Sequence, residues 1–326
     1  MTKKVQKTTA LSAYVNTLSF RNGRATCTKI AKSYSRGAKS ISHDTLQQLL
    51  DSQTCLEGEL SSKNKNLLKN KRGWLILDDT VIDKRWSKEQ PHLSWVWSSS
   101  DQCYVYGISC VLLIWTDGNT RVPLGMRFWK SSEKRTKLSL AMDLLDEAKT
   151  LWKQHVAYVV FDSWYSSAAM MKHVESLGWY WVCRIKCNRI VNGNNRVDEC
   201  FRHRFGSAEV TLNKGISAFV VKNETVFFAT NKKGLTPVQV KKLYQGRQWV
   251  EEVIRILKSS LHLEECSARS ENAQKAHVYL CLIAFCQLER YRIKYGFETM
   301  YKFRDELFEC KIPPNLAWNL HFRKVA

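Results

Sequence analysis

The chain has 326 residues, of which 44% are hydrophobic, so it can bury a sizeable core, and long disordered stretches are not expected. It carries 51 Lys and Arg against 30 Asp and Glu, a formal net charge of +21. Such an excess attracts polyanions rather than stabilising a core, so we expect DNA or RNA first among its partners, with an anionic membrane surface as the rival explanation. No apolar run reaches the roughly 18 residues of a membrane-spanning helix.

Cysteine usage and the N-terminus bear on the compartment. The 11 cysteines are odd in number and lack the spacing of a zinc site, which predicts reduced thiols in a reducing compartment. The basic N-terminus has no continuous apolar segment typical of a secretion signal. We therefore expect a cytoplasmic protein with access to the chromosome.

Residues 1–72 are polar and rich in lysine. Short helices are predicted over 25–34 and 41–52, separated by a turn over 35–40 that contains a glycine. This order is the outline of a helix-turn-helix DNA-binding region, although an ordinary helical hairpin explains the pattern equally well. Residues 61–72 read as a charged linker.

From residue 73 the chain alternates apolar strands and helices. The predicted strands cover 73–79, 104–115, 120–129, 157–162 and 179–186, and the predicted helices cover 133–154 and 166–178. Residues 187–240 hold glycine, asparagine and short alternating pieces, which predicts a β-rich insertion. Helices return from about residue 240, and a long one is predicted over 271–295. This order predicts an α/β fold with a mixed sheet flanked by helices.

Two of the predicted strands end in aspartate. Asp78 and Asp79 close the first strand, and Asp162 closes the strand over 157–162. A single aspartate at such a position is commonly a turn or cap residue. Two of them at the carboxyl ends of buried strands in one sheet favour a metal-binding pair, because α/β sheets place ligands at that edge. The first strand reads as buried on both faces, so its pattern does not choose between Asp78 and Asp79.

A third acid is predicted on the helix that contains QWVEEVIRILKSSL. At about 100° per residue, Tyr244, Arg247, Glu251 and Lys258 fall on one narrow stripe, and Glu252 projects away toward solvent. The core stripe of the same helix comprises Val250, Val253, Ile254, Leu257 and Leu261. A solvated face with an Arg247–Glu251 ion pair is the alternative explanation.

Carboxylate oxygens at three such positions suit Mg²⁺ or Mn²⁺, and two such ions can promote phosphodiester cleavage. Arg247 and Lys258 would then bind phosphate groups. Lys84 and Arg85 follow the first acidic pair closely and are further candidates for DNA contact, although a general basic surface also explains them.

The spacing Tyr244-x2-Arg247-x3-Glu251-x6-Lys258 resembles the Y-R-E-K signature of a large group of bacterial insertion-sequence transposases. Those proteins have an RNase H-like catalytic core with a DDE triad. Their first acid precedes threonine, as in the Asp-Asp-Thr here, and their second is followed closely by an aromatic residue. The resemblance covers roughly residues 73–295 and implies that Asp79, Asp162 and Glu251 form the triad.

The resemblance also implies a domain organisation. Residues 1–72 would be the helical DNA-binding region, 73–186 the first part of the RNase H-like core, and 187–240 the insertion found in many relatives. Residues 241–326 would supply the catalytic helix and the C-terminal helical part of the core.

The implied activity is cut-and-paste transposition: metal-dependent cleavage at the ends of a DNA element, followed by strand transfer. The implied cofactor is a pair of Mg²⁺ or Mn²⁺ ions. The implied partners are double-stranded DNA of the element ends and the target, with a homodimer in the DNA complex. Two alternatives remain open. One is a nuclease of the same fold that joins no ends, and the other is a transposase-derived DNA-binding protein without catalysis.

Overall fold

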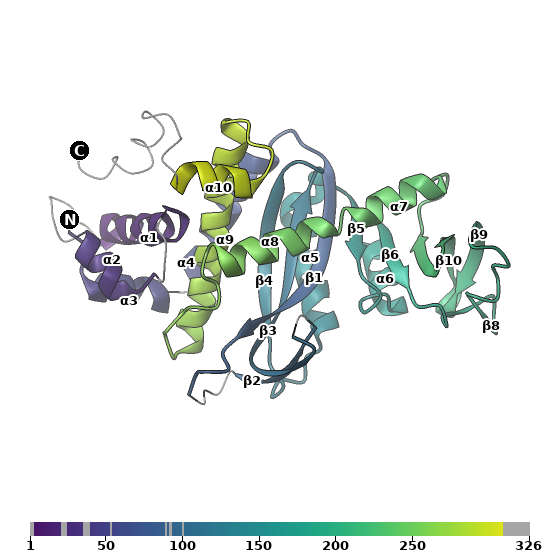
Figure 1. The fold of residues 1–326 in the computed structure, drawn as a ribbon, viewed down its shortest axis with the longest axis horizontal. Helices are drawn as coiled ribbons and strands as arrows, with labels where there is room; N and C mark the ends of the chain where they lie inside the picture. The colour runs from purple at the N-terminus through teal and green to yellow at the C-terminus, as the bar shows by residue number, and fades with distance from the viewer. Residues whose placement is uncertain are drawn as a thin grey trace. The chain divides into compact units, whose positions relative to one another are not determined.

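A computed structural model describes residues 3–20, 25–34, 40–52, 54–88, 90, 93–99 and 101–308 (Figure 1). The chain divides into two compact units. Unit 1 comprises 1–69, 81–108 and 253–326, and unit 2 comprises 70–80 and 109–252. This division differs from the predicted one, because the N- and C-terminal helices belong to the same unit.

Unit 2 is built on a mixed sheet. Its central strands are β1 (Gly73–Asp83), β3 (Cys103–Thr116), β4 (Arg121–Trp129), β5 (Val156–Phe161) and β6 (Tyr180–Ile185), and the unit boundary falls within β1 and β3. β1 pairs in parallel with β5, β5 pairs in parallel with β6, and β3 pairs antiparallel with β4. These strands confirm the predicted mixed sheet. They read as apolar runs because the sheet is covered on both faces.

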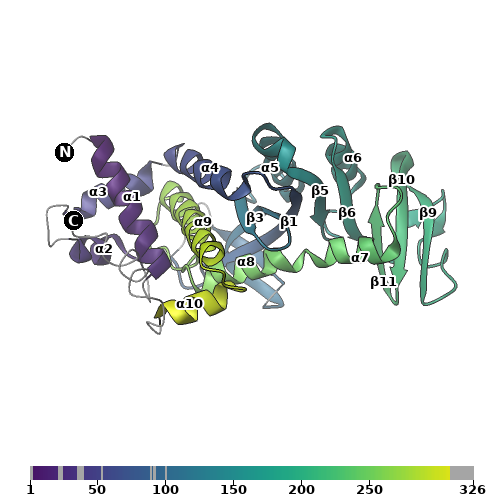
Figure 2. The same ribbon diagram turned by 90° about the horizontal axis from the view of Figure 1, so that it is seen from above.

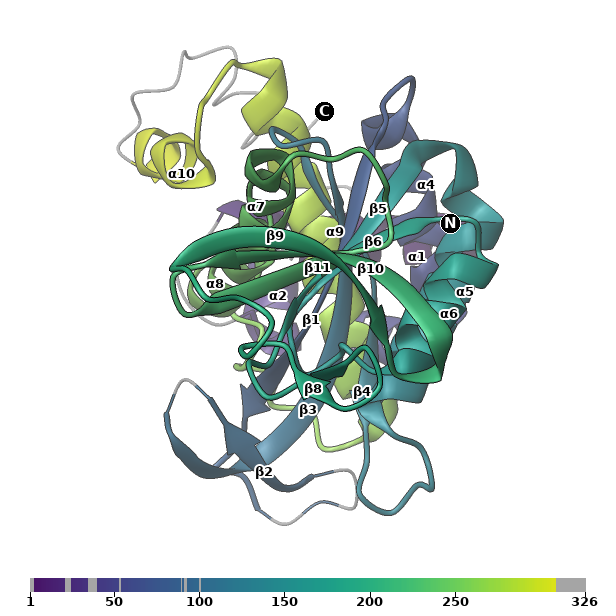
Figure 3. The same ribbon diagram turned by 90° about the vertical axis from the view of Figure 1, so that its right-hand side faces the viewer.

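The β-rich insertion extends this sheet instead of forming a separate body. Its strands are β7 (Ile190–Val191), β8 (Asn195–Arg196), β9 (Phe205–Leu212), β10 (Ile216–Asn223) and β11 (Val226–Thr230), with the short 3-10 turn η2 (Asn213–Gly215) between β9 and β10. β11 pairs antiparallel with β6, and β10 lies between β11 and β9 (Figure 3). The insertion is therefore anchored to the core strand that follows Asp162 in sequence.

Helices cover both faces of the unit 2 sheet. α5 (Lys137–Trp152), followed by η1 (Lys153–His155), and α6 (Ala168–Ser176) lie on one face, and α7 (Pro237–Gln245) lies on the other (Figure 2). α5 and α6 begin at Thr136 and Ser167, whose side chains accept backbone N–H groups, as N-caps do. Pro237 at the first turn and a capping box from Thr236 start α7.

Unit 1 is mostly helical. It contains α1 (Lys3–Phe20), α2 (Cys27–Ser33), α3 (His43–Asp51), α4 (Thr54–Leu68), α9 (Glu271–Lys294) and α10 (Met300–Phe308), together with β2 (Ser94–Ser98), which pairs antiparallel with β3. α9 is buried on nearly all sides and packs against α1, α3 and α4. Because α9 supplies the centre of this core, the N-terminal helices are packed against a C-terminal helix. None of the helices in the described residues is long and apolar enough to cross a membrane.

Two details of the N-terminal region differ from the prediction. The segment predicted as a charged linker is largely helical, because α4 runs to Leu68 and buries Leu60, Leu67 and Leu68. The helix α1 was not expected from the polar sequence. The predicted helices over 25–34 and 41–52 are present as α2 and α3, but most of the predicted turn between them lies outside the described residues. The helix-turn-helix role stays a prediction.

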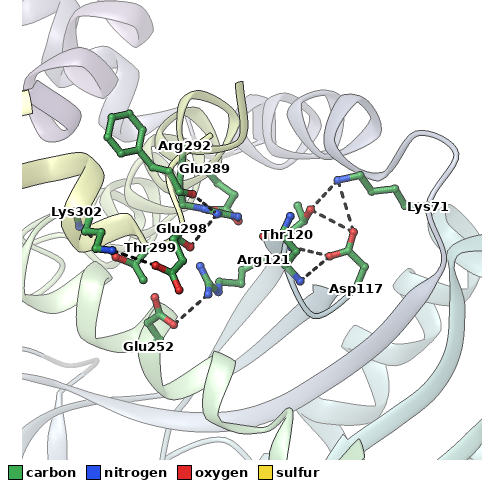
Figure 4. A network of polar contacts seen from close by, with 12 residues as sticks. Lys71, Asp117, Thr120, Arg121, Glu252, Glu289, Arg292, Glu298, Thr299 and Lys302 are labelled. Carbon is green, nitrogen blue, oxygen red and sulfur yellow. Dashed lines mark hydrogen bonds and ion pairs between the residues drawn. The ribbon is translucent and has the colours of Figure 1, made fainter. Parts of the chain in front are cut away.

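The core of unit 1 contains a buried ion pair on α9 (Figure 4). Arg292 Nε and Nη2 donate to the two carboxylate oxygens of Glu289 at 2.7 and 2.8 Å. Arg292 Nη1 also donates to the carbonyls of Phe297 and Glu298, so the guanidinium has both carboxylate and carbonyl acceptors although almost no surface of Arg292 or Glu289 is exposed. Such a pair is costly to break, because removing one partner leaves a buried charge.

Candidate active site

Parallel pairing of β1 with β5 places the strand-end acids together. Leu77 is opposite Phe161 in the register, so Asp78 and Asp162 are the next residues along the two strands. In parallel neighbours, residues at matching positions point to the same face of the sheet. Asp78 therefore matches Asp162 along the two strands, whereas Asp79 is the next residue of β1 and also lies close enough to the buried Tyr165 to raise its pKa.

The surroundings of the two adjacent aspartates agree with this geometry. Asp78 is buried and accepts a hydrogen bond from Arg247 Nη2 at 2.8 Å. Asp79 is 30% exposed and pairs at 2.6 Å with Lys137 Nζ, at the start of α5. The structure thus groups Asp78, not the predicted Asp79, with Arg247 of the signature.

Burial raises the pKa of Asp78 to about 6, although Arg247 opposes the shift and the nearby Asp79 and Asp162 add to it. The hydroxyl of Tyr165 is buried beside the same acids. Its pKa is raised well above the usual value by burial and then by Asp79, Asp78 and Asp162. The site thus concentrates negative charge where water is largely excluded, which is the electrostatic condition of a cation-binding site.

Asp162 is held by a local turn. Its Oδ1 accepts the backbone N–H groups of Trp164 at 2.8 Å and Tyr165 at 3.4 Å. The other carboxylate oxygen makes no hydrogen bond with the described residues. The turn fixes the direction of the carboxylate just past the end of β5.

We predicted that the four signature residues lie on one continuous helix, but the structure divides them between two helices and the turn that joins them. Tyr244 is on α7, Arg247 is in a turn, and α8 (Gln248–Ser259) begins after it. Gly246 occupies the turn because a Cβ there would lie 3.0 Å from Nε1 of Trp74. The close approach of this turn to β1 brings the Arg247 guanidinium to Asp78. Tyr244 packs against Phe228 with ring centroids 4.9 Å apart, and burial raises its pKa to about 12.

Glu251 lies beside Arg247, which donates to it at 2.6 Å through Nη1. One guanidinium therefore bridges Asp78 and Glu251. The exposure of the two glutamates is the reverse of that predicted. Glu251 is 54% exposed, whereas Glu252 is 18% exposed and pairs with Arg121 at 3.4 Å (Figure 4). The core stripe also differs at one position, since Ile256 is buried and Ile254 is half-buried. Burial of Ile256 in place of Ile254 turns the buried face of α8 toward Glu252 and away from Glu251.

The three remaining basic candidates belong to unit 1. Lys258 Nζ donates to the Val81 carbonyl at 2.6 Å and pairs with Glu264 at 3.0 Å. Lys84 is buried, and its ammonium donates to the carbonyls of Glu264 and Cys266. Little of Lys84 is left to meet a phosphate, so we do not retain it as a DNA contact. Arg85 is half-exposed and pairs with Asp83 at 2.6 Å.

The donor set fits a divalent cation in its chemistry. The carboxylates of Asp78, Asp162 and Glu251 offer the hard oxygen ligands that Mg²⁺ and Mn²⁺ prefer. No group of three acidic, histidine or cysteine side chains is arranged as a finished metal site in the described part of the chain. Instead, positive side chains balance the acids: Arg247 contacts Asp78 and Glu251, and Lys137 contacts Asp79.

Sequence reasoning missed two residues of this site. Lys137 begins α5, and its pairing with Asp79 depends on how α5 packs on the sheet, which no local pattern shows. Tyr165 was noted only as an aromatic residue after the second acid. Its position three residues after Asp162, in the turn that follows β5, is the sequence signal that could have placed it near the acids.

The family assignment agrees with this geometry. The model of the transposase DDE domain family matches residues 69–286, which covers more than half of the chain and includes Asp78, Asp79, Asp162 and Glu251. The chain therefore belongs to the transposase DDE domain family, and its fold is the RNase H-like mixed α/β fold of transposases. No curated protein matches the sequence.

Solved structures give a likeness in fold. The chain is similar to the piggyBac transposase in a synaptic complex with hairpin DNA, with a TM-score of 0.53, 12% identity, and coverage of 99% of this chain and 76% of that one. Endonuclease V of Ciona intestinalis matches with a TM-score of 0.28 and 10% identity over 58% of this chain and 87% of that chain.

Proposed function

We propose that this protein is an active DNA transposase that cleaves DNA at the ends of an insertion sequence and joins those ends to a target. The observation that carries the proposal is the Arg247 guanidinium bridging Asp78 and Glu251 at the edge of the sheet where Asp162 also lies. A buried carboxylate, a second strand-end carboxylate and a more exposed glutamate are thereby gathered around one cation-binding position.

Asp162 and Glu251 are kept as predicted, and Asp78 is taken as the first acid in place of Asp79. The reason is register: Asp78 matches Asp162 across the parallel pair and faces Arg247, whereas Asp79 is held by Lys137. Asp79, favoured by the resemblance alone, is the alternative first acid. Because Asp78 contacts Arg247 and Asp79 contacts Lys137, single substitutions can separate their roles.

The three carboxylates would hold Mg²⁺ or Mn²⁺, one or two ions, which would activate the attacking oxygen and stabilise the leaving oxygen of the phosphodiester. The protein's own groups would position the DNA. Arg247 donates to two carboxylates through its two terminal nitrogens, and the same two nitrogens can bind the oxygens of a phosphate. The net positive charge of the chain would attract the duplex. Lys258 and Arg85 remain proposed DNA contacts, and synapsis of two ends would require a homodimer.

Joining of ends separates a transposase from a nuclease of the same fold. The DNA flanking the gene supplies the substrate, since an insertion sequence is bounded by short inverted repeats and duplicated target. We expect the protein in Mg²⁺ or Mn²⁺ to join a labelled, pre-cleaved end to plasmid DNA. Asp78→Asn should abolish joining, and Asp79→Asn should retain most of it.

Other results of the joining assay would identify a different activity or a different first acid. Hydrolysis of the plasmid without joining would identify a nuclease. Binding of the end without either reaction would identify a DNA-binding protein that has lost catalysis. Loss of joining in Asp79→Asn with retention in Asp78→Asn would reverse the choice of the first acid.

A further inference from the structure

A basic pocket adjoins the candidate active site and is not explained by it. The pocket has a volume of about 600 Å³ and lies wholly within unit 2. Its polar lining comes from the turn after β5, from the end of β6 and the residue after it, and from the insertion: Ser163, Arg184, Lys186, Asn188, Arg196 and Thr225. No acidic and no aromatic residue lines it. The lining therefore favours an anion and offers no ring on which a base could stack.

The three cations differ in how far their charge is balanced. Arg196 forks to Asp198 at 2.6 and 3.1 Å, so most of its charge is already compensated. Arg184 and Lys186 are exposed, and in the described part of the chain neither makes an ion pair. They are two residues apart, Arg184 in β6 and Lys186 directly after it, and both line the pocket. Two neighbouring uncompensated cations repel each other, and an anion between them would relieve the repulsion.

The position of the pocket ties it to the acids. Ser163, which lines the pocket, directly follows Asp162. Arg184 lies close enough to Tyr244 of α7 to act on its ionisation. A strand whose phosphodiester lay at Asp162 would therefore reach the pocket within the span of a few nucleotides, because its backbone carries one phosphate at each.

We propose that the pocket holds a backbone phosphate of the DNA strand that passes the candidate active site, with Arg184 and Lys186 as the binding cations. The inference rests on the proposed function for its ligand. An arginine fork and a lysine together suit a phosphodiester, and the hydroxyls of Ser163 and Thr225 add neutral donors. The volume also lies in the range of small-ligand pockets, larger than a single phosphate group needs.

The first test compares equal losses of charge. Arg184→Ala with Lys186→Ala removes the two proposed cations. Lys153→Ala with Lys172→Ala, two exposed residues outside the pocket, is the matched control. Binding of a fluorescent oligonucleotide would be followed by anisotropy in Ca²⁺ over a series of salt concentrations. We expect the pocket pair to weaken binding on the order of tenfold and to reduce the salt slope by about one, with a clearly smaller effect of the control pair.

The second test locates the phosphate. Each phosphate of the oligonucleotide would be replaced in turn by an uncharged methylphosphonate. Wild-type protein should lose affinity most at one position near the cleavage point, and the pocket variant should be insensitive there. Equal sensitivity of wild type and variant at every position would overturn the proposal. Competition by inorganic phosphate as effective as that by DNA would show a small-anion site and would also overturn it.

These readouts do not depend on catalysis. The protein could neither cleave nor join DNA and still lose affinity at one methylphosphonate position in wild type but not in the pocket variant. That result would support the phosphate-binding pocket and contradict the proposed function. If the protein joins DNA but wild type and pocket variant respond equally to every methylphosphonate, the proposed function is supported and the pocket assignment is wrong.

Discussion

Glu251→Gln should reduce DNA cleavage by at least roughly a thousandfold, because a metal ligand contributes several kcal/mol to the transition state and each 1.36 kcal/mol is a factor of ten. The amide keeps the size of the side chain and its hydrogen bond from Arg247, but it removes the negative charge. Folding should be little affected, since Glu251 is 54% exposed and an exposed ion pair contributes about 1 kcal/mol or less. Cleavage of end DNA under single-turnover conditions measures the effect.

Glu252→Gln is the matched control on the next residue. Glu252 pairs with Arg121, which also stacks over Trp249 at 4.1 Å, and does not contact Arg247. Cleavage should stay within a few-fold of wild type. Unchanged nicking in Glu251→Gln, or an equal loss in both variants, would show that Glu251 is not a member of the site.

Glu289→Ala should lower the free energy of unfolding by about 3–5 kcal/mol, as expected when one partner of a buried ion pair is removed. The substitution leaves the Arg292 guanidinium buried in the core of unit 1 without the carboxylate that balances its charge. Because native proteins are stable by only about 5–15 kcal/mol, this loss is large enough to lower the yield of folded protein. Urea unfolding followed by circular dichroism measures it.

Lys302→Ala provides the comparison. It breaks the Lys302–Glu298 pair, whose two side chains are 66% and 78% exposed, and should change stability by less than about 1 kcal/mol (Figure 4). If Glu289→Ala unfolded at the same urea concentration as Lys302→Ala, the buried pair would contribute nothing beyond a surface pair.

Much of the fold could be predicted from local pattern. The strands around Asp78 and Asp162 are apolar runs of strand length, and the cap residues Thr136 and Ser167 mark where helices begin. The helix α1 was missed, since its first residues are polar and its buried face, which includes Tyr14 and Leu18, packs against a helix more than 250 positions later. Burial created by distant segments leaves little trace in local composition.

The candidate site was predicted in outline but not in detail. Asp162 and Glu251 could be proposed from the sequence because strand ends and the signature spacing are local features. The choice between Asp78 and Asp79 depends on the register of β1 against β5, which brings together residues about 80 positions apart. Helical counting placed Glu252 in solvent because it assigned Ile254 rather than Ile256 to the core stripe, which turns the expected buried face of α8 away from Glu252. The turn at Gly246 between α7 and α8 was not expected either. Close approach to Trp74, a tertiary contact, sets that turn.

The most direct test of the account is a change of metal preference at Asp162. A thiolate is a softer ligand than a carboxylate and binds Mn²⁺ better than Mg²⁺, so Asp162→Cys should lose DNA cleavage in Mg²⁺ and regain it in Mn²⁺. Asp162→Ala, which offers no ligand, should remain inactive in both metals. Regained cleavage in Mn²⁺ by the cysteine variant alone would show that Asp162 binds the catalytic metal. Full cleavage by Asp162→Cys and Asp162→Ala in Mg²⁺ would contradict the account.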